Sequence, residues 1–157
     1  MSYDLRQFDD LLRRRLQHHA ASGLPLYSDS AVVLLLGTAA HESGFGTFLR
    51  QVNGPALGIF QIEPPTFEWL RGKYEDQFPR LLGVTADQLE WDLDLSILVA
   101  RLRYYVAPPP LPDPTDLEDM AAYWFEHYNC SGVEARRQQF MLDWKRYGLP
   151  WETHIDV

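Results

Sequence analysis

The chain has 157 residues, a formal net charge of −8 and a pI near 5.0. A chain of this length can bury roughly 70% of the surface that it exposes when unfolded, so one domain can form a core without metals or disulfides. The acidic balance makes nucleic acid a poor partner, because neutralising phosphates takes clustered Lys and Arg. The single cysteine, Cys130, excludes an intramolecular disulfide.

The first predicted helix covers about residues 4–21, where apolar residues recur at helical spacing. The apolar stripe consists of Leu5, Phe8, Leu12 and Leu16. Gly23 and Pro25 end this segment.

A second helix is predicted from the N-cap candidates at residues 28–30 to about Glu42. It is apolar nearly all round, which is typical of a central buried helix rather than a surface helix. Residues 43–65 follow as a loop region rich in Gly and Pro, in which residues 57–62 can form a short extended segment.

Further helices are predicted along the rest of the chain, the next at about residues 66–73. Thr85 with Gln88 fits a capping box, and Asp92 or Asp94 can cap a helix that runs to about Val106. Residues 108–114 contain five prolines and form a connector that cannot be helical.

Thr115 with Glu118 fits a second capping box, for a helix to about Tyr128. The last helix runs from about residue 133 to residue 147, where Gly148 and Pro150 stop it. The pattern predicts one mainly α-helical domain over residues 1–157.

Glu42 is the unusual residue of the second helix, because it lies at the C-terminal end of an apolar segment and directly before a glycine-bearing loop. Desolvation disfavours its charged form, and the negative end of the helix dipole acts in the same direction. Both effects raise a carboxyl pKa, as a general acid near neutral pH requires. The alternative is a helix-end glutamate that swings into solvent or accepts a loop N–H.

Three segments in one order carry a family resemblance: residues 41–45 (HESGF), 56–66 (ALGIFQIEPPT) and 127–132 (HYNCSG). Together they resemble the lytic transglycosylase domains of the lysozyme-like superfamily over about residues 28–132. That family carries a Glu-Ser pair at the end of a buried helix, a Gly-Leu-Met-Gln-type segment followed by Pro-x-Thr, and an Ala-Tyr-Asn-Ala-Gly segment. The predicted helices at either end of the chain lie outside the resemblance and are expected to pack on the domain.

The resemblance implies a lysozyme-like helical fold. It also implies an enzyme that cleaves the β-1,4 bond between N-acetylmuramic acid and N-acetylglucosamine in peptidoglycan. Glu42 is then the acid and afterwards the base. The residues implied to bind substrate or orient the carboxyl are Ser43, Gly58, Phe60, Gln61, Tyr128 and Asn129.

The chain departs from the family pattern at three positions. Phe60 replaces a Met, which keeps an apolar contact but changes the shape of the pocket. Cys130 replaces a small Ala, and we interpret it as a small buried packing residue. His127 replaces an Ala, and its role stays open.

The position of a second carboxylate decides between two reactions. No Asp or Glu lies between Glu42 and Gln61, and the nearest later candidates are Glu63 and Glu68. This favours a one-carboxylate reaction that leaves 1,6-anhydro-muramyl ends, with a hydrolytic muramidase or endolysin as the alternative. A second alternative is a structural component of a virion or secretion apparatus, and a third is a chitinase-like enzyme.

Peptidoglycan strands are the expected partner, and we expect no cofactor. Metal binding is not expected either, because a His-Glu-x-x-His site would need a histidine where Phe45 stands. The N-terminus shows no secretion signal, and residues 31–36, the longest apolar run, cannot cross a bilayer. We therefore expect synthesis in the cytoplasm, no membrane insertion, and delivery to the wall through a holin or as part of a phage virion.

Overall fold

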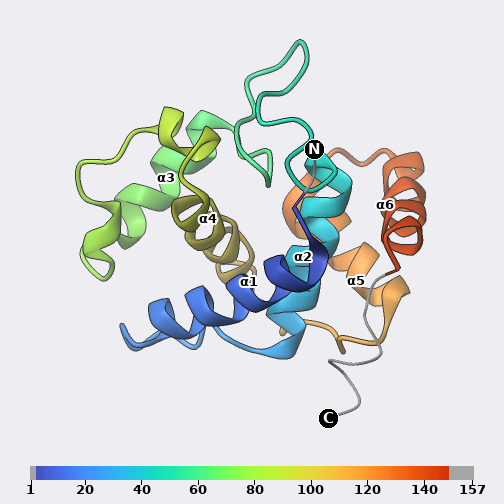
Figure 1. The fold of residues 1–157 in the computed structure, drawn as a ribbon, viewed down its shortest axis with the longest axis horizontal. Helices are drawn as coiled ribbons and strands as arrows, with labels where there is room; N and C mark the ends of the chain where they lie inside the picture. The colour runs from blue at the N-terminus through green and yellow to red at the C-terminus, as the bar shows by residue number, and fades with distance from the viewer. Residues whose placement is uncertain (1–2, 149–157) are drawn as a thin grey trace.

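Helix α2 (Asp29–Ser43) runs through the centre of the computed structural model, which describes residues 3–148 (Figure 1). It contacts α1 (Leu5–Ala20), α4 (Leu93–Tyr105), α5 (Leu117–Trp124) and α6 (Glu134–Arg146). Helix α3 (Pro64–Tyr74) packs on α4 at the other side of the molecule. The prediction of a mainly α-helical chain is confirmed, and so is the central place of the second helix.

Most helix starts follow from a capping side chain. Ser28 Oγ accepts a hydrogen bond from Ala31 N at 3.0 Å and opens α2. Of the two candidates for α4, Asp92 is the cap, because its carboxylate accepts from Leu95 N at 3.1 Å. Thr85 and Gln88 form the predicted capping box, but it opens a separate short helix, η2 (Ala86–Glu90).

Two predicted starts are wrong, and in both cases the reason is local. Helix α3 begins at Pro64 rather than at Thr66, since proline suits the first turn of a helix, where an N–H has no partner. Helix α5 is capped by Asp116, not by Thr115, whose hydroxyl instead donates to Asp113 Oδ1 at 2.5 Å. It is also shorter than predicted.

After Trp124 the chain continues as a π-helical turn, η3 (Phe125–Asn129), which ends at Cys130 in the left-handed region with φ of 56°. A short helix η1 (Pro79–Leu81) lies between α3 and η2. Within residues 3–148, extended structure is limited to two isolated antiparallel bridges, which pair Leu57 with Arg50 and with Ile62. Of the short extended segment expected at residues 57–62, only the two end residues, Leu57 and Ile62, form a bridge.

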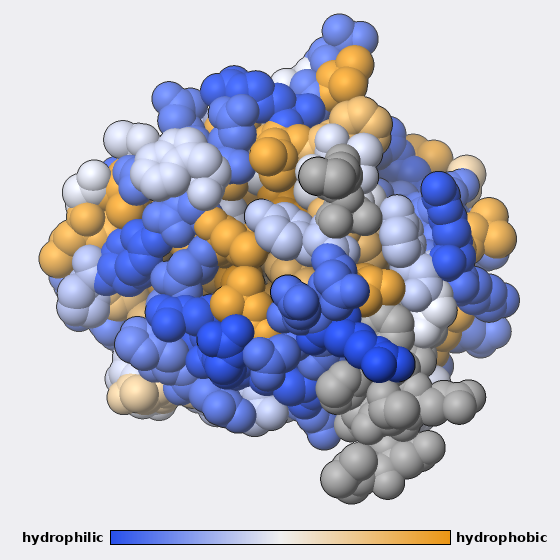
Figure 2. Space-filling model, viewed as in Figure 1, coloured by the Kyte–Doolittle hydropathy of each residue, from blue (hydrophilic) through white to orange (hydrophobic). Residues whose placement is uncertain are grey.

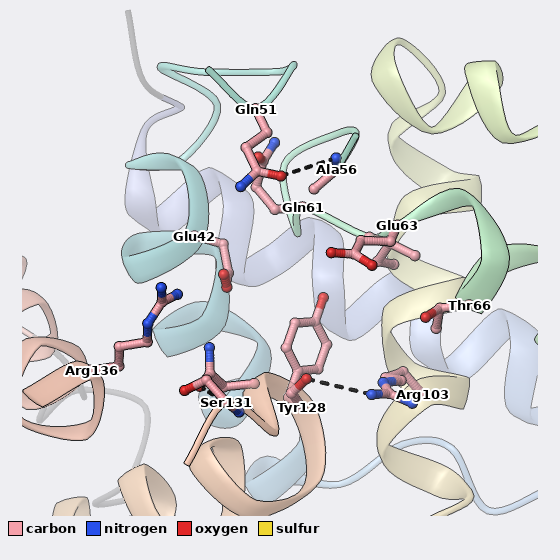
Figure 3. Close-up of a pocket in the computed structure, with 12 residues that line it drawn as sticks. Glu42, Gln51, Ala56, Gln61, Glu63, Thr66, Arg103, Tyr128, Ser131 and Arg136 are labelled. Atoms are coloured by element: carbon pink, nitrogen blue, oxygen red, sulfur yellow. Dashed lines mark hydrogen bonds between the residues drawn. The ribbon is translucent and has the colours of Figure 1, made fainter. Parts of the chain in front are cut away.

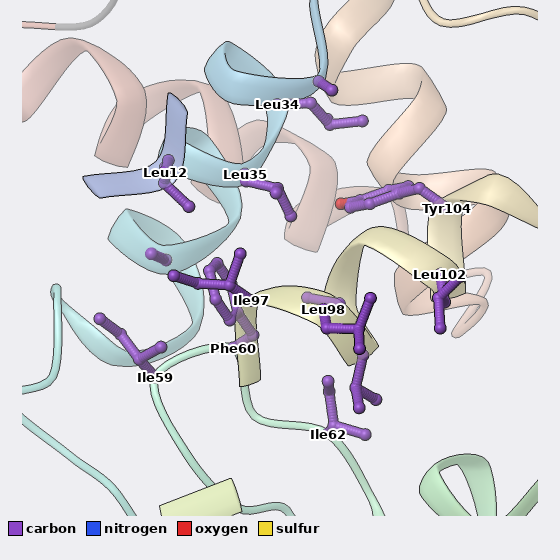
Figure 4. Packing of buried hydrophobic residues seen from close by; sticks show 14 of the residues in the cluster. Leu12, Leu34, Leu35, Ile59, Phe60, Ile62, Ile97, Leu98, Leu102 and Tyr104 are labelled. Atoms are coloured by element: carbon purple, nitrogen blue, oxygen red, sulfur yellow. The ribbon is translucent and has the colours of Figure 1, made fainter. Parts of the chain in front are cut away.

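The core lies where α2, α4 and the loop before α3 meet (Figure 4). Leu35 of α2, Ile97 and Leu98 of α4, and Phe60 of the loop are all fully buried there. Burying a side chain of this size contributes about 1.5–3 kcal/mol. The loop that carries much of the motif segment is therefore fixed to the two central helices.

Helix α6 lies against α2 because Gly37 leaves room for an indole ring. A Cβ atom at Gly37 would lie 2.5 Å from two ring atoms of Trp144, so only glycine permits this approach. His41 Nδ1 and Asp143 Oδ2 join the same two helices at 2.8 Å. This contact fixes which residues of α6 face the end of α2.

The surface seen in Figure 2 is a mosaic in which hydrophilic side chains dominate over α1 and apolar side chains form smaller patches. One apolar patch lies on the segment that projects after α2, where Phe48, Leu49 and Val52 are exposed. Among residues 3–148, no helix combines the length and the apolar character that crossing a membrane requires.

Candidate active site

A pocket of about 440 Å³ opens at the C-terminal end of α2 (Figure 3). Its walls come from the end of α2, the loop before α3, the first turn of α3, helix α4, and the segment from η3 to α6. The lining residues are Glu42, Gln51, Ala56, Gln61, Ile62, Glu63, Thr66, Arg103, Tyr128, Asn129, Ser131 and Arg136. Four of the seven residues proposed from the sequence thus meet in one pocket: Glu42, Gln61, Tyr128 and Asn129.

Glu42 directs its carboxyl group into this pocket (Figure 3). Gly44 ends the helix two residues later in the left-handed conformation, with φ of 57°. Burial raises the pKa of Glu42 to about 8, and the positive charge of Arg136 offsets part of that rise. Within residues 3–148, the Glu42 carboxyl forms no hydrogen bond or ion pair, so it is free to meet a ligand. At neutral pH this group holds a proton that it can donate.

Ser43 lies beneath the pocket rather than in its wall. Its side chain is buried, and its hydroxyl donates to Ile59 O at 2.6 Å and accepts from Gly46 N at 2.9 Å. These bonds join the end of α2 to both sides of the following loop. Ser43 therefore positions the loop and does not present its hydroxyl to a ligand.

Gly58 and Gln61 shape the turn that faces Glu42. Gly58 has φ of 82°, and a Cβ atom there would lie 2.2 Å from Leu89 O, so the loop requires glycine at this position. Gln61 also has a positive φ, of 49°, and its Nε2 donates to Gly58 O at 2.9 Å. Gly58 thus permits the conformation of the turn without lining the pocket, while the Gln61 side chain lines it.

Tyr128 forms the wall opposite Gln61 (Figure 3). Its hydroxyl donates to Phe60 O at 2.6 Å, and its ring stacks on Tyr104 with centroids 4.9 Å apart. Burial raises the pKa of Tyr128 well above its ordinary value, and the nearby Glu42 carboxylate adds to the rise. The phenol therefore stays neutral. Phe60 itself is buried in the core and contributes its carbonyl to this arrangement rather than its ring.

The segment after η3 forms the polar lip of the pocket. Asn129 Oδ1 accepts from Ser131 N at 3.2 Å, and both residues line the pocket. Cys130 is exposed, so its interpretation as a buried packing residue is wrong: the left-handed turn directs the side chain outward. His127 packs on the ring of Tyr123, with centroids 4.6 Å apart, away from the pocket lining.

Several lining residues carry no signal in the sequence. Arg103 of α4 and Arg136 of α6 belong to none of the three motif segments, and only the packing of their helices brings them to the pocket. Of the two candidates for a second carboxylate, Glu63 lines the pocket, whereas Glu68 is exposed and pairs with Arg71 at 2.6 Å. The composition of the site is therefore two carboxyl groups, two guanidinium groups, amides and hydroxyls.

In the part of the chain that the structure describes, no group of three or more His, Cys, Asp or Glu side chains is arranged to hold a metal ion. The chemistry that the pocket itself offers is proton transfer by Glu42 together with hydrogen bonding by its polar walls.

No protein-family model, no curated protein and no solved structure matches this chain. What connects the pocket to a function is therefore its own geometry, together with the three motif segments that meet around Glu42.

Proposed function

We propose that this protein is a peptidoglycan-cleaving glycosidase with a lysozyme-like fold, in which Glu42 is the general acid. The observation that carries the proposal is Glu42 itself: a carboxyl group with a pKa of about 8 and no protein partner among residues 3–148, in a pocket with polar walls. Cleavage of a glycosidic bond needs an acid that is protonated at working pH to protonate the leaving oxygen.

The reaction that we propose is that of a lytic transglycosylase. Glu42 gives its proton to the glycosidic oxygen as the bond between this oxygen and C1 of N-acetylmuramic acid breaks. The 6-hydroxyl of the same sugar then attacks C1, and its proton passes to the Glu42 carboxylate. The product carries a 1,6-anhydro ring, and Glu42 is protonated again for the next cycle.

The neighbouring residues take supporting roles in this proposal. The amides of Gln61 and Asn129 are placed to hydrogen-bond sugar hydroxyl and N-acetyl groups. Tyr128 fixes the Phe60 carbonyl directly before Gln61, and Ser43 fixes the end of α2 that carries the acid. Gly58 allows the close turn on which Gln61 depends.

A second candidate function is hydrolysis, and the place of Glu63 favours it. This carboxylate lines the same pocket as Glu42 (Figure 3). An inverting glycosidase uses a second carboxylate to activate water on the opposite face of the sugar. In that case the product would carry a reducing muramyl end, and Glu63 would be the base.

One experiment separates these reactions. Purified sacculi are digested with the wild-type protein, Glu42→Gln and Glu63→Gln, and the released muropeptides are identified by mass spectrometry. We expect anhydro-muramyl products from the wild-type protein and from Glu63→Gln, and none from Glu42→Gln. Reducing products that disappear in Glu63→Gln would establish the hydrolase instead. Substantial release by Glu42→Gln would contradict the glycosidase proposal.

A further inference from the structure

The pocket holds an arginine whose charge no carboxylate of the described residues neutralises. Arg136, in the first turn of α6, lies at the pocket wall beside Glu42 (Figure 3). Its guanidinium is exposed and forms no hydrogen bond or ion pair within residues 3–148. Its positive charge nevertheless acts on both His41 and Glu42, and lowers the pKa of each.

This lack of a partner is not the rule in this acidic chain. Seven arginines form ion pairs with carboxylates within the described residues: Arg13, Arg14, Arg15, Arg50, Arg71, Arg80 and Arg137. Arg137, next to Arg136 on α6, pairs with Glu134 at 3.2 Å. Five described arginines form no ion pair. Two of them, Arg103 and Arg136, line the pocket, whereas Arg6, Arg101 and Arg146 lie elsewhere.

Glu42 does not supply the missing negative charge. Because its pKa is raised to about 8, Glu42 is mostly neutral at pH 7. Among residues 3–148, the second guanidinium of the pocket, Arg103, has only neutral hydrogen-bond partners, Tyr128 O at 3.5 Å and Cys130 Sγ at 3.9 Å. Two guanidiniums therefore face the pocket against one exposed carboxylate, Glu63. The wall beside the acid is suited to an anionic group of a ligand.

A guanidinium prefers carboxylate and phosphate groups, which it can bind through two parallel hydrogen bonds. In a glycan of alternating N-acetylglucosamine and N-acetylmuramic acid, the anionic groups are carboxylates. They belong either to the lactyl arm of the muramyl sugar, where no peptide is attached, or to the stem peptide that this arm carries. Chitin, which has the same backbone without the lactyl arm, offers none.

We infer that Arg136 is a binding site for a carboxylate on the lactyl arm or stem peptide of N-acetylmuramic acid, and that it distinguishes peptidoglycan from chitin. This inference rests on the proposed function and names the part of the substrate that selects it. It also assigns a role to α6, which lies outside the motif segments. Arg136 binds substrate and takes no part in the proton transfer.

The test measures binding in the Glu42→Gln background, so that no ligand is cleaved. Four tetrasaccharides are compared by calorimetry: the muramyl form with free lactyl carboxylates, its lactyl carboxamide, the form with dipeptide stems, and chitotetraose. Adding Arg136→Gln should weaken binding of at least one carboxylate ligand about tenfold or more, and leave the carboxamide and chitotetraose unchanged. Arg136→Lys should restore part of the affinity, since it keeps the positive charge but cannot form the two parallel hydrogen bonds of a guanidinium.

Arg14→Gln is the matched control, because it removes the same charge from α1, away from the pocket. A loss confined to free lactyl arms, or to stems, identifies which carboxylate binds. Equal losses for all four ligands, no loss for any, or no binding at all would overturn the inference. Cleavage of sacculi without carboxylate-selective binding refutes this inference alone. Carboxylate-selective binding without cleavage refutes the catalytic proposal alone.

Discussion

The proton on Glu42 is linked to folding as well as to catalysis. The ordinary pKa of this group is 4.5, and the folded protein raises it to about 8. Below pH 4.5 the carboxyl is protonated in both states. Between these two values the unfolded chain ionises while the folded protein keeps its proton, so stability falls as pH rises through this window.

Glu42→Gln removes this dependence, because an amide does not ionise. The unfolding free energy of the variant, relative to that of the wild-type protein, should therefore rise as the pH goes from 4.5 to 8. The rise should total roughly 3 kcal/mol, after allowance for the partly accessible carboxyl. Urea denaturation at several pH values measures this difference. A constant difference across the range would show that the carboxyl is not held in its neutral form. An inactive but more stable variant would also separate loss of chemistry from loss of folding.

Tyr128 acts on the site through a single hydrogen bond. Tyr128→Phe removes the donor to Phe60 O and leaves the stacked ring in place. We expect a loss of about 1–2 kcal/mol in unfolding free energy, because a shielded carbonyl loses its partner. Activity on sacculi should fall too, since Phe60 leads directly into Gln61.

Tyr105→Phe is the matched control on α4, because the Tyr105 hydroxyl has no hydrogen-bond partner among residues 3–148. Its cost should stay below about 0.5 kcal/mol. Equal effects of the two substitutions would contradict the role given to Tyr128.

At the scale of elements, the loop before α3 depends on one glycine. In Gly58→Ala the new methyl group would meet Leu89 O at 2.2 Å, on a backbone with φ of 82°. We expect a loss of about 3 kcal/mol or more, together with loss of activity, since Gln61 Nε2 binds the same residue's carbonyl. Gly72→Ala, in α3 and with no atom within 4 Å of the added carbon, should instead gain about 0.5–1 kcal/mol. Thermal unfolding of both variants checks the pair.

The elements also explain how far the sequence predicts the site. Glu42 could be recognised because its features are local: an apolar helix before it and a glycine after it. Arg136 could not be recognised as a pocket residue, because its position depends on the contact of α2 with α6. That contact is set by Gly37 and Trp144, which lie about a hundred residues apart in the sequence. The sequence does not predict that Cys130 is exposed, because a π-helical turn rotates the residues that follow it, and helical periodicity contains no sign of such a turn.

At the scale of the molecule, Asp94 joins segments that are distant in the sequence. Its carboxylate accepts from Arg15 and His19 of α1, at 2.6 and 3.0 Å, and from Arg80 of η1 at 3.0 Å. Burial raises the pKa of Asp94, but the hydrogen bonds and charges of these partners outweigh burial and hold the pKa well below its ordinary 3.8. The stability that this group contributes is therefore present above pH 3.8 and is lost as the pH falls further.

Asp94→Asn should lower the unfolding free energy by about 2–3 kcal/mol at neutral pH, because it leaves three partly buried donors without their charged acceptor. The difference from the wild-type protein should shrink below pH 4, where the wild-type carboxylate also begins to lose its charge. Asp10→Asn is the control: it removes an equal charge from an exposed pair with Arg14 and should cost less than about 0.5 kcal/mol. If urea denaturation showed the same small loss of unfolding free energy for both variants, α1 would be held on α4 by its apolar face alone. A large cost for Asp94→Asn alone would mean that this ion cluster helps to hold α1 on α4, and α1 also packs on α2, the helix that carries Glu42.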